Sequence, residues 1–254
     1  MDPRLALDVT PERAGWRYVG FAVVRLGAGE RYERLTGARE LCAVVLGGRC
    51  QARVGDASWE LGGRTSPLDG PPHALYVPPS TTALFTSAEG AEIALCSAPA
   101  SGGAPARGMG PGEIPTEVRG AGGTQRTIHH ILMEDGEAES LLVTEVLTPA
   151  GHWSSYPPHK HDTDDPPRET ALEETYYHRM RDARGFALQR VYTADGSLDE
   201  AITVRDGDLV LVPRGYHTVS AAPGHELYYL NVMAGPVRRW CVTFDPDHDQ
   251  PRPG

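Results

Sequence analysis

The chain has 254 residues, of which 40% are hydrophobic and 23% are charged, and its formal net charge is -10. This composition is ordinary for a globular protein, and the length suits one large or two small domains. The acidic balance and the lack of a basic block argue against a nucleic-acid-binding protein, because such proteins usually carry a basic face.

The ends and the cysteines indicate the compartment. Residues 1–20 lack the basic start and apolar core of a secretory signal, and no apolar run approaches the roughly 18 residues of a membrane span. We therefore expect no membrane partner. The four cysteines show no CxxC spacing, which favours buried free thiols in a reducing, cytoplasmic compartment. They are Cys42, Cys50, Cys96 and Cys241.

In the first half of the chain, short apolar or alternating runs are separated by turns rich in Gly and Pro. Strands at this spacing predict an all-β barrel or sandwich, with no helix longer than about two turns before residue 97. The predicted strands are 17–25, 41–46, 74–77 and 91–96.

A segment dense in Gly and Pro follows, and it is the best linker candidate in the chain, because such a composition disfavours a packed element. We predict an N-terminal domain over residues 1–97, a linker over 98–125 and a C-terminal domain over 126–254.

After the linker the β pattern resumes, and the two halves share a rhythm of glycine turns, apolar strands and proline turns. The predicted strands are 126–133, 140–147, 173–179, 186–192, 201–204, 208–213, 218–221, 226–233 and 238–244. This rhythm suggests a duplicated barrel with metal donors only in the second copy. In the first copy Arg31 and Glu33 occupy the region where histidines would fall, and Glu40 is the only donor left.

The donor set of the second half centres on His159 and His161, which would point the same way on a strand. His217 lies in the later turn PRGYH, and a carboxylate between these histidines would complete a set suited to a divalent first-row metal. Strand alternation allows only one of Glu173 and Glu174 to face the metal, and we choose Glu174 with Glu173 as the fallback. An HxH pair by itself is weak evidence.

Longer strings strengthen the interpretation. Gly151-x7-His159-x-His161 with Glu174 resembles the first motif of the cupin superfamily, and Gly207-x5-Pro213-x-Gly215-x-His217 resembles the second. The strings PPHKHD, EETYYHR, FALQRVYT, DGDLVLVPRGYH and LYYLNVMAGP are similar to the 5-deoxy-glucuronate isomerase family of inositol catabolism.

This resemblance implies a bicupin, two jelly-roll-like β-barrels in tandem, with a degenerate first barrel. It implies metal ligation by His159, His161, Glu174 and His217. The metal would be zinc, manganese or iron. The loop DTDDPPRETAL separates His161 from Glu174 more widely than in ordinary cupins. It makes Glu169, Asp164 and Asp165 weaker alternative donors, because a loop carboxylate more often faces water.

The implied reaction converts 5-deoxy-D-glucuronate, a sugar acid, to 5-dehydro-2-deoxy-D-gluconate. This aldose–ketose isomerisation proceeds through an enediolate, whose charge a metal would stabilise as a Lewis acid. A general base, typically worth about 10²–10⁴-fold, must move the proton.

Several side chains compete for the catalytic and substrate-binding roles. His178 shares a strand face with Glu174, although it could instead face solvent at the strand end. With His178, we name Tyr229 and Gln189 as catalytic candidates. Arg190 is a candidate clamp for the substrate carboxylate, although arginines are common on surfaces. Tyr176 and Asn231 complete the substrate-binding candidates.

Other functions fit the same donors. An iron-dependent cupin dioxygenase would use a similar ligand set, and a bicupin could also act as a non-enzymatic sugar-binding protein. The chain has no DNA-binding segment to suit a sensor, and its intact donor set argues against storage. Exposed sheet edges make a homo-oligomer reasonable.

Overall fold

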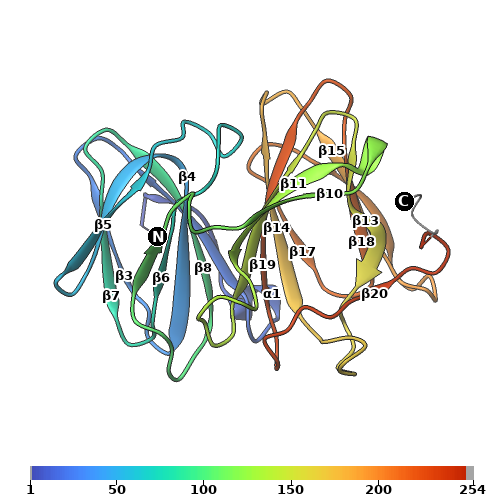
Figure 1. Ribbon diagram of the computed structural model, residues 1–254, viewed down its shortest axis with the longest axis horizontal. Coiled ribbons are helices and arrows are strands. Elements are labelled where there is room, and N and C mark those ends of the chain that lie inside the picture. Colours follow the sequence, from blue (N-terminus) through green and yellow to red (C-terminus); the bar gives the residue numbers. More distant parts are fainter. Residues whose placement is uncertain (1, 250–254) are drawn as a thin grey trace. The chain divides into compact units, whose positions relative to one another are not determined.

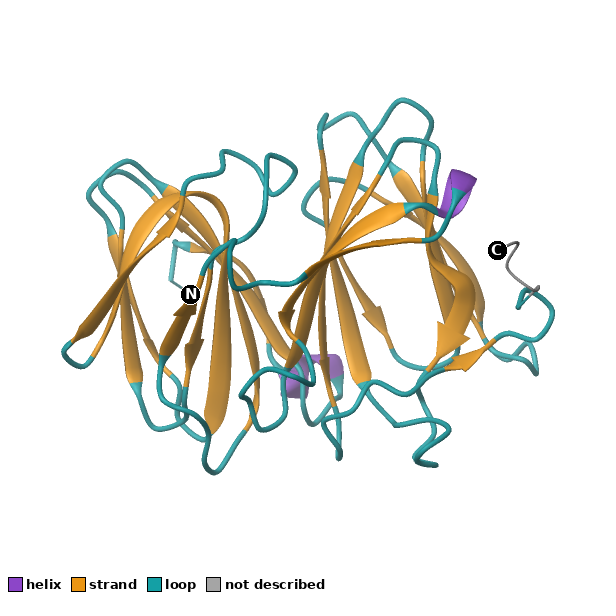
Figure 2. Cartoon of the chain, in the orientation of Figure 1, coloured by secondary structure: helices purple, strands orange, loops and turns teal. Residues whose placement is uncertain are grey.

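The computed structural model of the protein describes residues 2–249. Strands dominate both halves of the chain, and the helices of the described residues are only α1 (Pro11–Ala14) and the 3-10 turn η1 (Gly122–Thr124) (Figures 1 and 2). The predicted all-β class is confirmed. The chain divides into two compact units. The first comprises the residues up to Pro115 with His129–Thr144 and Val232–Ala234, and the second comprises Thr116–Ile128, Glu145–Asn231 and the residues from Gly235 onward.

The first unit is built around a nine-stranded sheet whose main path runs β1-β2-β8-β4-β6-β9, with β3, β5 and β7 paired beside it. The strands are β1 (Leu5–Val9), β2 (Gly20–Leu26), β3 (Arg31–Leu35), β4 (Arg39–Val54), β5 (Ala57–Gly62), β6 (Ala74–Val77), β7 (Thr82–Thr86), β8 (Ala91–Pro99) and β9 (Arg107–Met109).

Strand β4 belongs to both walls of this unit. Its first part pairs with β6 and β8, and from Arg49 onward it pairs with β5 and β7. The change falls at a bulge between Val45 and Gly47, as expected where a strand turns a barrel corner. Gly48 has φ +80°, and a Cβ there would lie 2.2 Å from the carbonyl oxygen of Gly90, so only glycine fits.

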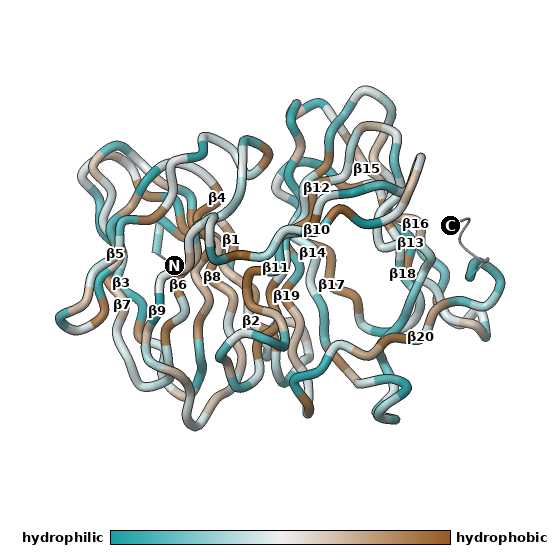
Figure 3. The backbone as a smooth tube through the Cα atoms, viewed as in Figure 1, coloured by the Kyte–Doolittle hydropathy of each residue, from teal (hydrophilic) through white to brown (hydrophobic). Residues whose placement is uncertain are grey.

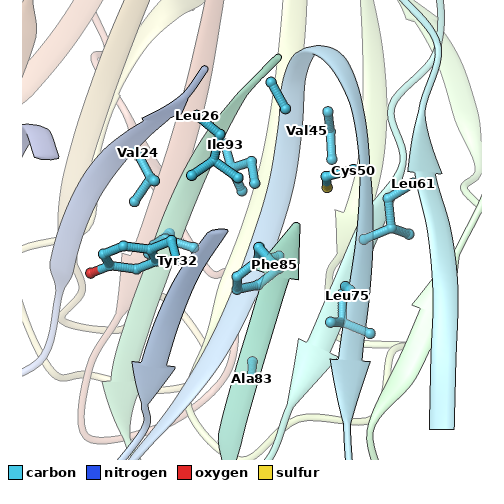
Figure 4. Close-up of a cluster of buried hydrophobic side chains, with 14 of the residues drawn as sticks. Val24, Leu26, Tyr32, Val45, Cys50, Leu61, Leu75, Ala83, Phe85 and Ile93 are labelled. Carbon is cyan, nitrogen blue, oxygen red and sulfur yellow. The ribbon is translucent and has the colours of Figure 1, made fainter. Parts of the chain in front are cut away.

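Apolar side chains fill the interior between these walls. Tyr32, Leu61, Phe85, Val24 and Leu75 belong to one buried cluster, and Figure 4 shows their side chains between the strands. In β3, strand alternation directs Tyr32 inward and leaves the flanking arginine and glutamate exposed. Neither Arg31 nor Glu33 therefore contributes a donor to the interior of this unit.

Glu40, the only donor expected in the first half, is fully buried and serves as a structural acceptor. It accepts hydrogen bonds from the Tyr76 hydroxyl at 2.8 Å and from the backbone N–H groups of Glu139, Ser140 and Leu141 at 2.9, 2.6 and 2.6 Å, all within the first unit. A buried carboxylate with this many donors is well compensated.

The second half of the chain supplies two further sheets, one with the order β10-β11-β12-β19-β14-β17 and one with the order β16-β15-β18-β13-β20. Their strands are β10 (Thr116–Arg119), β11 (Arg126–Leu132), β12 (Leu142–Thr148), β13 (Trp153–Lys160), β14 (Glu173–Met180), β15 (Ala187–Tyr192), β16 (Asp199–Val204), β17 (Leu209–Val212), β18 (Tyr216–Ala221), β19 (Leu227–Ala234) and β20 (Thr243–Phe244). Along the backbone β17 is hydrophobic, whereas β13 and β14 are hydrophilic over most of their length (Figure 3).

The predicted linker is more ordered than its composition suggests. Residues 98–125 contain β9, β10 and η1, so the expectation that no packed element would form there is wrong. Glycine is part of the reason. Gly108 lies in β9, and a Cβ on it would lie 2.4 Å from the Trp59 ring, so the missing side chain lets β9 pack against that indole.

The sequence pattern located most strands within a few residues, but besides β9 and β10 it missed β1, β3, β5, β7 and β13. Strand β13 contains Pro157 and Pro158, which made it resemble a loop. Among the described residues, no helix has the length and apolar character needed to cross a membrane.

Gly48 gives a test of the barrel corner. Gly48→Ala should lower the free energy of unfolding by about 2–4 kcal/mol, because it adds a left-handed backbone cost and an overlap with the Gly90 carbonyl. Gly55→Ala is the matched control, since Gly55 also has positive φ but a Cβ there meets nothing within 4 Å; it should cost about 1 kcal/mol. Urea unfolding measures both, and equal losses would contradict the corner role.

Candidate metal centre

The backbone places two histidines face to face. In the antiparallel pair of β13 and β18, His159 lies directly opposite His217, and a register shift separates this pair from the pairing of Ser154 with Val219. Opposite residues of an antiparallel pair project from the same face with Cβ atoms about 5 Å apart. His161 follows two residues after His159, which brings its ring to the same side.

The three imidazoles form a buried group. One ring nitrogen from each of His159, His161 and His217 lies within 4.8 Å of the others, and the three residues are 7%, 3% and 0% exposed. The ring centroid of His217 is 4.6 Å from that of His159 and 5.1 Å from that of His161. The predicted three histidines therefore converge in the structure.

Glu174 enters this group from the other sheet, at the start of β14. Its Oε2 atom lies 2.9 Å from Nε2 of His161 and 2.9 Å from Nε2 of His217, and the residue is 3% exposed. Glu173 lies on the opposite face of the strand and is half-buried. Two donors bound to one first-row ion at about 2.1 Å lie about 3 Å apart when they meet at a right angle, which these spacings match.

Main-chain carbonyls fix the tautomers of two of these rings. Nδ1 of His161 lies 3.1 Å from the carbonyl oxygen of Leu172, and Nδ1 of His217 lies 3.2 Å from that of Gly215. Each carbonyl accepts an N–H from its ring. The lone pair of Nε2, on the side that faces Glu174, is then free to bind a metal ion. Nε2 of His217 is buried without a hydrogen-bond partner, so the residues present fit a metal ion.

Burial and neighbouring charges shift the pKa values of these side chains in opposite directions. Burial lowers the pKa of His159 well below its usual value, as does the neighbouring His217, which keeps this ring neutral as a ligand must be. Burial also acts to lower the pKa of His161, but the hydrogen bond and charge of Glu174 outweigh it and raise that pKa. Burial acts to raise the pKa of Glu174, but His217 and His161 lower it strongly.

A layer of hydroxyl groups lies next to the histidines. Tyr176, two residues after Glu174 on β14, has its ring centroid 5.7 Å from that of His217. The hydroxyl of Ser155 lies 3.0 Å from that of Tyr176 and 3.2 Å from that of Tyr229, and the hydroxyl of Ser154 lies 2.5 Å from that of Tyr229. All four are buried. No motif predicted the two serines.

His178 and Gln189 form the next layer, and both are fully buried. Nε2 of His178 lies 2.8 Å from Oε1 of Gln189, and the His178 ring stacks on Tyr176 with a centroid distance of 6.0 Å. Nδ1 of His178 and Nε2 of Gln189 have no hydrogen-bond partner. Asn231 donates to the Thr175 carbonyl at 3.4 Å and also interacts with the Tyr176 hydroxyl.

The structure does not bring Arg190 to this group. Arg190 follows Gln189 on β15 and therefore projects from the opposite, exposed face. Its guanidinium forms an ion pair with Asp199, with both N–O distances 2.9 Å, and lies 3.9 Å from the centre of the Tyr192 ring. It lines an outer groove of about 620 Å³ together with Trp153, Tyr156, Leu188 and His248, among others.

The loop carboxylates are also apart from the histidines. Glu169 is buried but pairs with Lys160 at 2.8 Å, whereas Asp164 is exposed and Asp165 pairs with Arg168. Carboxylates in loops usually face water, and nothing in the local sequence of Glu169 indicates that it would be buried. Trp240 and Phe244 close the outer side of the group, with ring centroids 5.9 and 6.0 Å from that of His159.

Several known proteins are similar to this chain in sequence and in fold. The profile of the KduI/IolB family matches residues 1–250. A 5-deoxy-glucuronate isomerase from Geobacillus kaustophilus is 51% identical over 243 residues, which are 95% of this chain and 88% of that protein. The crystal structure of an IolB-like protein from Salmonella typhimurium is 45% identical with a TM-score of 0.95, and the match covers 98% of this chain and 95% of that one.

A more distant structure addresses the fold alone. An oxalate decarboxylase from Bacillus subtilis is 15% identical with a TM-score of 0.63, over 96% of this chain and 77% of that one. The shared architecture confirms the predicted bicupin of two jelly-roll-like barrels. Together with the full-length sequence match, these findings show that the chain belongs to the KduI/IolB family.

Proposed function

We propose that this protein is a metal-dependent isomerase that converts 5-deoxy-D-glucuronate to 5-dehydro-2-deoxy-D-gluconate in myo-inositol catabolism. The observation that carries the proposal is a buried set of three imidazoles and one carboxylate in a chain that matches a 5-deoxy-glucuronate isomerase over 95% of its length. The reaction moves a proton between two adjacent carbons of a sugar acid and needs no external oxidant.

His159, His161, Glu174 and His217 are the proposed ligands, with Glu173 set aside because it faces away. Zinc, manganese or iron suits this mixture of nitrogen and oxygen donors. A bound divalent ion would supply Lewis-acid stabilisation of the charge that develops on the substrate oxygens. The Nδ1 contacts of His161 and His217 support the proposal, because they present Nε2 before any ion arrives.

We assign proton transfer to Tyr229, in the hydroxyl layer next to the ligands, and to His178 with Gln189, in the layer after it. Burial raises the pKa of Tyr229, so its hydroxyl stays protonated at neutral pH and can donate to a substrate oxygen. Burial lowers the pKa of His178 to about 4, so its ring is neutral and can accept a proton. Gln189 accepts the Nε2 proton of that ring, which leaves the unpaired Nδ1 as the basic atom.

Tyr176 and Asn231 are the proposed substrate contacts, since the Tyr176 ring lies beside those of His217 and His178 and Asn231 interacts with the Tyr176 hydroxyl. Arg190 is not retained as the carboxylate clamp, because Asp199 already neutralises it on the outer face. We place the enzyme in the cytoplasm, supported by four cysteines that are free in the structure, three of them buried. Self-association through exposed sheet edges stays a prediction.

Removal of one ligand tests the metal centre. His161→Ala should lose stoichiometric metal and lower the isomerisation rate by about 10³-fold or more, because several kcal/mol of charge stabilisation is removed. Metal analysis and loss of the substrate aldehyde signal measure the two effects. His152→Ala is the matched control and should change neither, since its ring contacts the Gln125 carbonyl instead. Oxygen uptake by the wild-type protein would instead favour a dioxygenase.

Tyr229 gives a test of proton donation. Tyr229→Phe removes only the hydroxyl and should lower kcat by about 10²–10⁴-fold while the metal content stays unchanged. Tyr216→Phe, which alters another buried tyrosine of the same barrel, should keep the wild-type kcat. A Tyr229→Phe enzyme with full kcat would remove this residue from the proton path.

The pH dependence of stability tests the buried, neutral state of His178. Its folded pKa of about 4 lies below the unfolded value of about 6.5, so the unfolded chain takes up a proton that the native state excludes as the pH falls between these values. The neutral ring therefore contributes about 3 kcal/mol to the free energy of unfolding above pH 6.5, and this contribution is lost as the pH falls toward 4. His178→Asn should flatten the pH dependence of unfolding by that amount, and an unchanged slope would contradict a neutral buried ring.

A further inference from the structure

The segment between β13 and β14 is closed onto the barrel by backbone contacts at its far end. The N–H of Leu172 donates to the carbonyl of His161 at 2.8 Å, and the N–H of Thr170 donates to the carbonyl of Cys241 at 3.1 Å. Because the Leu172 carbonyl in turn holds Nδ1 of His161, the position of this segment determines the orientation of that ring.

At the end of this segment nearer β13, a lysine that points away from the histidines forms the main ionic contacts. Lys160 lies between His159 and His161, and its Nζ atom donates to both carboxylate oxygens of Glu169 at 2.8 and 2.9 Å and to Oδ1 of Asp162 at 2.8 Å. Glu169 also accepts the backbone N–H groups of residues 162 and 163 at 2.9 and 2.8 Å. Its side chain is only 5% exposed, so this charge depends on its partners.

Asp162 extends the same network to the third histidine. Its Oδ2 atom accepts the backbone N–H of Gly215 at 2.7 Å, and the carbonyl of Gly215 holds Nδ1 of His217. Gly215 has φ +86°, and a Cβ there would lie 2.3 Å from the carbonyl oxygen of Tyr192, so this turn tolerates no larger residue. One cation therefore connects, through two carboxylates, the backbone groups that orient His161 and His217.

We propose that Lys160, Glu169 and Asp162 form an ionic latch whose role is to position His161 and His217 for metal binding. The latch residues are positioning residues, since none of them contacts the imidazoles directly. The inference rests on the proposed metal site and adds to it the elements that pre-orient two of its ligands. Without Lys160, Glu169 would be buried without its cation and the loop would move, which would release the Leu172 and Gly215 carbonyls from their rings.

Lys160→Met in the full chain is the test. It should weaken Zn²⁺ affinity by about 10–100-fold, measured by competition with a chromophoric chelator, and alter the visible absorption of the Co²⁺-loaded protein. Arg179→Met is the matched control, because the Arg179–Asp206 pair has the same 2.8 Å distance and similar exposure in the same unit but does not hold a ligand carbonyl. The control should keep Zn²⁺ affinity within about threefold, even if both metal-free variants show a lower Tm.

A second variant separates positioning from general stability. Glu169→Gln should also weaken Zn²⁺ binding, and the double variant with Lys160→Met should be no weaker than the poorer single variant, because both act through one contact. Wild-type affinity in Lys160→Met, or single effects that multiply in the double variant, would overturn the latch. Zinc affinity is read without substrate, so a protein that binds zinc but does not isomerise contradicts the proposed function alone. A wild-type protein that binds no divalent ion overturns both.

Discussion

The buried carboxylate of Glu174 among three imidazoles is the interaction on which the second barrel's interior depends. A charge at 3% exposure needs compensation, and the carboxylate makes 2.9 Å contacts with Nε2 of His161 and of His217, where a metal ion bound to all three would supply it. Those contacts require the imidazoles to be turned correctly, which in turn requires carbonyl acceptors behind them, a bulged β13 and a fixed turn before β18. The strands around the centre are therefore arranged to support an electrostatic group, and Val191, Val204 and Val219 belong to a buried apolar cluster in the same part of the chain.

The two units illustrate how one architecture can carry different interiors. In the first, strand alternation directs Tyr32 and Phe85 inward, and the only buried acid of the expected donor region, Glu40, is consumed by backbone donors. In the second, the same alternation directs Glu174, Tyr176 and His178 inward as successive layers along one strand. Packing needs only apolar volume at these positions, so chemistry can be added or lost without a change of fold.

Strand alternation also explains how far the sequence could be interpreted. It predicted the face shared by Glu174, Tyr176 and His178, and it separated Glu174 from Glu173. The same rule places Gln189 and Arg190 on opposite faces of β15, and in the structure Gln189 is buried and Arg190 is exposed. Contacts between distant segments had no local pattern: neither the burial of Glu169 nor the bond from Gly215 to Asp162 follows from nearby residues. The prolines of β13 and the glycines of residues 98–125 concealed strands, because tertiary packing outweighed their usual preference for loops.

The carbonyl contacts behind His161 and His217 have a consequence for how this protein can change over time. Enzymes often orient a metal-binding ring with a second side chain, and a single substitution then disturbs the ring. Here the acceptors are peptide oxygens of Leu172 and Gly215, which every residue type possesses. Mutation at position 172 can therefore alter packing without deleting the acceptor itself. Ring orientation is inherited from the path of the chain, so the side chain at position 172 can diverge among descendants while the donor geometry persists, provided that Gly215 and the latch residues that hold this path are kept.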